Sequence, residues 1–191
     1  MSTKLIVGLG NPGAEYEQTR HNAGWWMLEQ LTRQYGVRLS PESKFSGLAA
    51  RAGDIWFLQP MTFMNRSGQS IAALANFYKI LPADILVLHD ELDIPCGAAK
   101  LKLGGSTGGH NGLKDTQAKL GTPDFWRLRI GIDHPRNSSI TQQPVVDYVL
   151  KPAKQNERQL IDEAIDKAIA SLPDWLNGNF EKAMRELHAK A

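Results

Sequence analysis

The chain has 191 residues and a mass of 21.2 kDa, and 42% of its residues are hydrophobic, which suffices for one domain with a substantial core. Its formal net charge of +2 at pH 7 does not by itself indicate a nucleic-acid partner. Its apolar runs are far shorter than the roughly 20 residues that cross a bilayer, so we expect no membrane contact. No secretory signal is recognised, and the single cysteine cannot form an internal disulfide. We therefore expect a cytoplasmic, single-domain protein (residues 1–191).

Strand and helix patterns alternate along the chain. Short apolar or period-two runs bounded by turn residues indicate strands, and apolar residues at helical spacing indicate helices. In chain order, the predicted elements are a strand at 4–9, a helix at 22–35, a hairpin at 47–52 and 55–58, a helix at 68–78, strands at 85–88 and 100–103, a helix at 113–120, a strand at 127–132, and helices from 154 and 179 onward. We expect Pro173 to break the helix that starts at 154. This order predicts an α/β fold, a mixed twisted β-sheet with helices on both faces.

Positive charge is concentrated between residues 97 and 136. This segment holds seven basic and three acidic residues, a net charge of +4 that leaves −2 for the rest of the chain. Its two strand patterns alternate cations with apolar residues, so each strand places two cations on one face of the sheet. These cations are Lys100, Lys102, Arg127 and Arg129.

Two glycine-rich loops match known motifs. Gly8, Gly10 and Gly13 fit the G-x-G-x-x-G pattern of dinucleotide-binding folds, but no strand that ends in Asp or Glu follows at the required distance. Residues 104–108 fit the G-x-S-x-G pattern of serine hydrolases around Ser106, but four further loop residues precede the next helix. A serine in such a loop is not held rigidly against a base. We therefore interpret the first motif as a tight turn and the second as a flexible glycine loop.

His21 and Asp90 are the candidates for acid–base chemistry. His21 follows a strand-to-helix loop and Asp90 lies at the end of another apolar strand, where open α/β sheets build their sites. If the two strands are neighbours, Asp90 can accept a hydrogen bond from the imidazole, which leaves the other ring nitrogen to take a proton from water. We interpret His89 and His134 as structural or surface residues. Because no i, i+4 histidine pair and no Cys/His cluster occurs, we expect no metal and no cofactor.

Three asparagines occur in loops or at helix starts near a predicted sheet edge, namely Asn11, Asn65 and Asn111. A neutral amide can donate to a developing oxyanion and accept from a substrate amide. Taken singly, each has a structural explanation that is favoured, such as a helix N-cap for Asn65 and a turn residue for Asn111.

Five motifs, in order, resemble those of bacterial peptidyl-tRNA hydrolases. They are GNPGAEYEQTRHNAG at 10–24, TFMN at 62–65, HDELD at 89–93, GGHNGLKD at 108–115 and RLRIGI at 127–132. The resemblance covers essentially the whole chain. It implies an enzyme that hydrolyses the ester between peptide and tRNA in peptidyl-tRNA and recycles the tRNA for translation.

The resemblance also implies roles for single residues. It implies that His21 is the general base, that Asp90 supports its basic form, and that Asn11 helps to distinguish a peptidyl chain from a free aminoacyl group. It implies substrate contacts, including aromatics that stack on the unpaired CCA end, for Tyr16, Phe63, Asn65 and Asn111. Lys102 and Arg129 match residues placed for the phosphates of the acceptor stem, in agreement with the basic segment. Nothing in the sequence demands a dimer, so we expect a monomer.

Two alternatives stay open from the sequence. One is a non-catalytic RNA-binding module of the same fold, although every catalytic-type residue is retained. The other is a serine hydrolase, which would depend on Ser106 instead of His21. Ser106 and Thr107 stand where relatives carry small residues or histidine, and we expect altered loop mobility at most.

Overall fold

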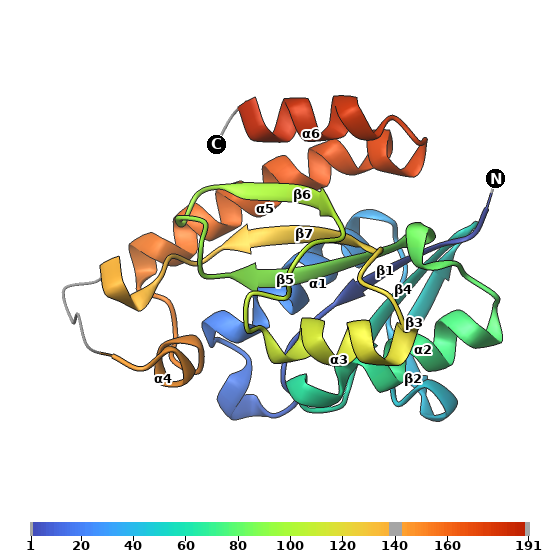
Figure 1. Cartoon of the computed structure of the whole chain (residues 1–191), viewed down its shortest axis with the longest axis horizontal. Helices are drawn as coiled ribbons and strands as arrows, with labels where there is room; N and C mark the ends of the chain where they lie inside the picture. The colour runs from blue at the N-terminus through green and yellow to red at the C-terminus, as the bar shows by residue number, and fades with distance from the viewer. Residues whose placement is uncertain (1, 138–142, 190–191) are drawn as a thin grey trace.

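A single seven-stranded sheet organises the computed structural model, which describes residues 2–137 and 143–189 (Figure 1). The strands are β1 Lys4–Gly8, β2 Ser40–Glu42, β3 Gly47–Ala52, β4 Ile55–Pro60, β5 Ile85–Glu91, β6 Ala99–Leu103 and β7 Trp126–Gly131, in the spatial order β2-β3-β4-β1-β5-β7-β6. Parallel pairing joins β4, β1, β5 and β7, whereas β2, β3 and β6 pair antiparallel with their neighbours. The predicted mixed sheet is therefore confirmed.

Helices cover both faces of the sheet, as predicted (Figure 1). They are α1 Ala23–Gln34, α2 Ser67–Phe77, α3 Asn111–Leu120, α4 Val145–Val149, α5 Gln155–Leu176 and α6 Phe180–Ala189. One core lies between the sheet and α1 and α5, with α6 added at the β6 edge, and the other lies under α2 and α3. Among the described residues, no helix combines the length and apolar character needed to cross a membrane.

The alternation of β1 shows why both faces must be covered. Leu5 and Val7 belong to the core under α2 and α3, whereas Ile6 belongs to the core under α1 and α5. All three side chains are completely buried. A strand that buries both sets of side chains is typical of the parallel centre of an α/β sheet.

The prediction that Pro173 breaks the long helix is wrong. Pro173 lies inside α5, which continues to Leu176. Proline removes one intrahelical N–H, but it stands in the last turn, where its own carbonyl still accepts a hydrogen bond from Asn177. The fully buried Trp175 packs this last turn against the core, which stabilises the helical conformation beyond Pro173.

The strand that carries Asp90 is longer than its apolar run indicates. The sequence predicts a strand only to residue 88, but β5 continues to Glu91 because β7 pairs with it through Gly131. β1 lies on the other side of β5, with Gly8 opposite Leu88. The chain segments that follow β1 and β5 therefore begin at the same edge of the sheet, as the placement of His21 and Asp90 requires.

Candidate active site

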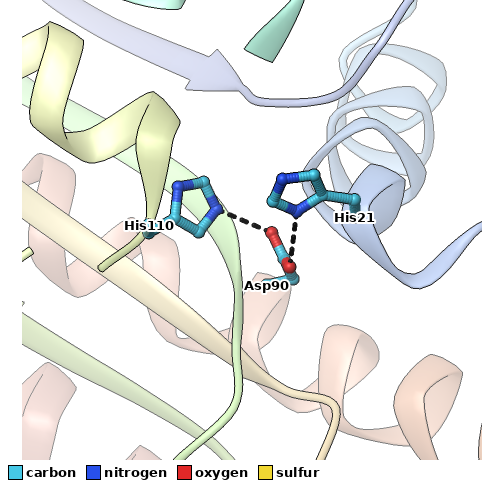
Figure 2. A group of neighbouring side chains, drawn as sticks. All are labelled: His21, Asp90 and His110. Atoms are coloured by element: carbon cyan, nitrogen blue, oxygen red, sulfur yellow. Dashed lines mark hydrogen bonds and ion pairs between the residues drawn. The ribbon is translucent and has the colours of Figure 1, made fainter. Parts of the chain in front are cut away.

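Asp90 binds two imidazoles at this sheet edge (Figure 2). Its Oδ2 lies 2.8 Å from Nδ1 of His21, and its Oδ1 lies 2.8 Å from Nε2 of His110. The three side chains come from the turn before α1, from β5 and from the residue before α3. The contact between His21 and Asp90 that the sequence left conditional on strand order is therefore present.

Close packing of α1 against the sheet brings His21 to Asp90. His21 is the middle residue of the 3₁₀ turn Arg20–Asn22, directly before α1. A Cβ on Gly24 would overlap the carbonyl oxygen of Leu88 and approach backbone atoms of Leu9 to 2.7 Å. Only glycine permits this close approach of helix to strand. Gly24, the last residue of the first motif, therefore helps to place His21.

Asn22 fixes the preceding loop to the same turn. Its side-chain Oδ1 accepts from the backbone N–H of Asn11 at 2.8 Å, and its Nδ2 donates to the carbonyl oxygen of Asn11 at 3.0 Å. Asn22 is completely buried. These two bonds hold the Gly10–Gly13 loop against the turn that carries His21, which gives this glycine motif a structural role.

His110 is a residue to which the sequence analysis gave no role. It is the N-cap of α3, and its Nδ1 accepts from the backbone N–H groups of Gly112 and Leu113 at 3.1 and 3.3 Å. With Nδ1 used as an acceptor, the ring proton of neutral His110 is on Nε2, which donates to Asp90. The signal that could have indicated this position is a histidine in a glycine-rich motif, three residues before the helix predicted at 113–120.

Asp90 is buried as a carboxylate. Burial alone would raise its pKa, but the adjacent His21 and His110 and their hydrogen bonds hold that pKa well below its ordinary value. An ionised carboxylate only accepts, so Nδ1 of His21 carries a proton and, in the neutral ring, Nε2 carries the lone pair. For His21, burial acts in the opposite direction and lowers the pKa. The charge of Asp90 and its hydrogen bond outweigh burial and leave the pKa of His21 raised.

His89 supports Asp90 from inside the protein. It is almost fully buried, and its Nδ1 donates to the backbone carbonyl of Asp90 at 2.8 Å. Burial, followed by the neighbouring His110, lowers the pKa of His89 to about 3. His89 is therefore neutral at physiological pH.

A cavity of about 330 Å³ opens beside the two imidazoles. Besides His21, Asp90 and His110, its wall includes polar residues and an apolar strip from α4, namely Glu91, Asn111, His134, Val145, Val146 and Val149. A larger open groove of about 780 Å³ beside α1 contains none of the predicted site residues. The smaller cavity is the candidate active site because it contains the carboxylate and the free nitrogen of His21.

His21, Asp90 and His110 are also the one group in the described residues whose potential ligand atoms could surround a metal ion, since these atoms lie within 4.8 Å of one another. The facing nitrogens, however, both donate to Asp90. To bind a metal through Nε2, His110 would need a proton on Nδ1, opposite the two N–H groups that this atom now accepts from. The arrangement therefore fits a hydrogen-bonded triad better than a metal centre.

The three candidate asparagines lie differently around this site. Asn11 is buried, and its Oδ1 accepts from the backbone N–H of Met64 at 2.7 Å, which fixes the orientation of the amide. Asn111 is the exposed first residue of α3 and lines the cavity. Asn65 is exposed in the 3₁₀ turn Met64–Arg66 and does not cap α2, whose N-cap is Arg66.

The two predicted aromatic contacts lie together. The rings of Tyr16 and Phe63 pack edge to face with centroids 6.4 Å apart, and Phe63 is 58% exposed. Phe63 directly precedes Met64, the residue whose backbone binds Asn11. The exposed ring of Phe63, packed against the half-buried Tyr16, is a surface on which unpaired bases can stack.

The four cations of β6 and β7 share one face, but they do not all remain free. Lys102 is exposed and pairs in register with Arg127. Arg127 is 2% exposed, and its guanidinium donates to the carbonyl oxygens of Ser106 and Pro123 at 2.8 and 3.0 Å. Arg129 forms a 2.9 Å ion pair with Glu91. Arg127 is therefore a structural cation that holds the glycine loop, which the alternation of β7 could not reveal.

Ser106 is exposed and is not arranged as a nucleophile. Its Oγ accepts from the backbone N–H of Gly108 at 3.1 Å, and no histidine contacts it among the residues described. Cys96 is no better suited, because burial raises the pKa of its thiol to about 12. The geometry therefore agrees with the preference for His21 over Ser106.

Comparison with known proteins identifies the family. The family model described as peptidyl-tRNA hydrolase matches residues 5–191. Peptidyl-tRNA hydrolases of Cupriavidus metallidurans and Neisseria meningitidis serogroup C are 58% and 59% identical, over 97% and 98% of this chain and 98% and 97% of theirs. The crystal structure of the peptidyl-tRNA hydrolase from Acinetobacter baumannii superposes with a TM-score of 0.91 at 47% identity, over 98% of this chain and 95% of that one. The chain belongs to the peptidyl-tRNA hydrolase family, as its five motifs predict.

Proposed function

We propose that the chain hydrolyses the ester of peptidyl-tRNA with His21 as the general base. Water attacks the ester carbonyl carbon while Nε2 of His21 takes its proton, and the resulting imidazolium is stabilised by Asp90. The bond from the carbonyl carbon to the ribose oxygen then breaks, and the imidazolium returns the proton to that oxygen. The observation that carries this proposal is the 2.8 Å bond between Nδ1 of His21 and buried Asp90, which leaves Nε2 at the cavity.

Asparagine amides supply the polar contacts that this reaction needs. Asn11 has its oxygen fixed by Met64, and its Nδ2 has no partner within residues 2–137 and 143–189. We assign this amide to the peptide linkage that a peptidyl group carries and a free aminoacyl group lacks. Asn111 at the cavity and Asn65 beside Met64 contact the substrate, and amide donors of this kind stabilise a developing oxyanion.

The RNA part of the substrate occupies two surfaces, the aromatic pair and the basic face of β6 and β7. The CCA end stacks on Tyr16 and Phe63, which present an edge-to-face aromatic pair. Phosphates of the acceptor stem lie along the face of β6 and β7 that carries Lys102 and Arg129. Each phosphate contact contributes a salt-dependent share of the affinity.

The reaction proceeds without a metal ion, because the facing donors of the triad are already used in hydrogen bonds. We also propose that the enzyme is cytoplasmic and monomeric, as its sequence leads us to expect. To test metal independence, the enzyme is treated with a chelator, freed of it by gel filtration and assayed. We expect full activity, and a loss that added Zn²⁺ restores would contradict the proposal.

A single assay separates this enzyme from a binding module of the same fold. The purified chain is incubated with N-acetylaminoacyl-tRNA, and the released N-acetylamino acid is quantified beside the fraction of tRNA bound. The enzyme releases the acid with multiple turnovers, whereas a binding module retains tRNA and releases nothing. We favour the enzyme because the base, its carboxylate partner and the cavity occur together.

A further inference from the structure

Arg20 is a buried cation beside His21 that the proposed reaction does not use. It is 6% exposed. Its Nη1 donates to the carbonyl oxygens of Tyr148 and Lys151 at 2.9 and 3.4 Å, and its Nη2 lies 3.0 Å from a carboxylate oxygen of Glu157. The guanidinium also lies over the Tyr148 ring, 3.9 Å from its centroid. One side chain thus joins the turn of the base to segments about 130 residues further along the chain.

Backbone contacts strengthen the same junction. The N–H of Arg20 donates to the carbonyl oxygen of Lys151 at 3.1 Å, and Thr19 forms an isolated antiparallel bridge with Pro152. The segment that follows α4 is therefore tied to the turn of His21 through both main chain and side chain. α4 has only five residues, so its position depends on such external contacts.

α4 forms an apolar part of the wall of the cavity that His21 also lines. Its cavity-lining residues are Val145, Val146 and Val149. Because Arg20 binds carbonyls at the end of α4 and directly precedes His21, it connects two walls of one cavity. We infer that Arg20 is a positioning residue that sets the separation between His21 and the α4 wall. This inference rests on the proposed role of His21 as the base.

The chemistry of arginine suits this task. Its planar guanidinium can serve two carbonyls and a carboxylate at once, whereas a lysine ammonium is a compact point charge on a flexible stem. Two backbone carbonyls and a mostly buried carboxylate on separate segments therefore call for arginine at this position. A role in charge balance alone would be met by lysine equally well.

The test separates positioning from stability with a pair of substitutions. Arg20→Met retains an unbranched apolar stem but removes every side-chain donor, and it leaves Glu157 without its cation. Adding Glu157→Gln removes the unpaired charge, while its amide oxygen can still accept from the backbone N–H of Lys154, as Glu157 does now at 2.9 Å. We expect Tm to fall in Arg20→Met and to recover at least partly in the double variant.

Catalysis is expected to respond differently from stability. In the folded double variant kcat stays about 10- to 100-fold below wild type, the range that a misplaced catalytic group costs, while KM changes little because the basic face is untouched. Recovery of kcat together with Tm would show a purely structural role and overturn the inference. Arg20→Lys is expected to give an intermediate kcat, and wild-type kcat in this folded variant would equally overturn it.

Two controls complete the experiment. Arg33→Met with Glu29→Gln makes the same exchange in an exposed pair, whose side chains are 73% and 69% exposed, and should leave kcat and Tm unchanged. His21→Ala is assayed in parallel. Wild-type kcat in His21→Ala would refute the base itself, whereas failure of the Arg20 series alone would refute only the positioning role.

Discussion

Replacing Asp90 with asparagine perturbs the site at the side chain that both imidazoles contact. Asparagine has nearly the same shape, but one of its two hydrogen-bonding positions becomes an NH₂ donor. In the native site both oxygens accept, one from His21 and one from His110, each at 2.8 Å. Only one of these bonds can persist in Asp90→Asn unless one imidazole changes its tautomer.

The cap of α3 decides which imidazole changes. Nδ1 of His110 must remain an acceptor for the N–H groups of Gly112 and Leu113, so its Nε2 retains the proton. The amide oxygen of the new residue therefore faces His110, and its NH₂ group faces His21. His21 is forced into the tautomer that carries a proton on Nε2, which then cannot take one from water.

The expected loss is that of a general base. Such a loss costs about 100- to 10,000-fold in kcat, or about 3–5 kcal/mol of transition-state stabilisation. The acid limb of the pH profile should also move. Burial lowers the pKa of His21 and Asp90 raises it above the ordinary value, so removing the Asp90 charge lowers this pKa and shifts the limb of the residual activity to lower pH.

Initial rates of N-acetylaminoacyl-tRNA hydrolysis over pH check both effects. The matched control is Asp93→Asn. It alters an exposed carboxylate in a loose ion pair, 3.7 Å from Arg136, and should retain wild-type kinetics. Asp90→Asn with kcat within a few-fold of wild type would refute the tautomer argument. An unmoved acid limb would refute the assignment of that limb to His21.

Two further predictions concern the substrate contacts. Asn11→Ala leaves the buried N–H of Met64 without its acceptor and should cost about 1–3 kcal/mol of unfolding free energy, which denaturant titration checks. Asn11→Asp keeps this acceptor but loses the amide donor, so it should lose selectivity for N-acetylaminoacyl- over aminoacyl-tRNA in paired substrate assays, and unchanged selectivity would contradict the assignment. Lys102→Ala and Arg129→Ala should each raise KM and reduce the slope of log affinity against log salt by about one, with little effect on kcat. The control Lys119→Ala, in an i, i+4 ion pair, should change neither KM nor this slope. An unchanged slope in the first two variants would exclude these residues from the phosphate contacts.

The regular elements around the site were predictable because their causes are local. The apolar run of β1, the glycine turn after it and the helix that follows His21 are all encoded by neighbouring residues. The place of His21 and Asp90 at strand ends followed from the same patterns. Their contact did not, because it depends on β1 and β5 being neighbours in the sheet, and pairing is set by the whole core.

The features that escaped prediction depend on partners distant in sequence. Alternation in β7 places Arg127 on the same face as Arg129, but only the fold shows that the glycine loop covers the first and leaves the second at the surface. His110 acquires its tautomer from the α3 cap and its partner from β5. Pro173 is tolerated because Trp175 is buried two residues later.

The central claim, that His21 is the base of an ester hydrolysis, is tested most directly by single-turnover hydrolysis of N-acetylaminoacyl-tRNA by His21→Ala. With enzyme in excess, the rate reports the chemical step, and tRNA binding is measured on the same samples. The account predicts a rate at least about 100-fold below wild type with tRNA binding largely intact. A wild-type rate in the folded variant would contradict it.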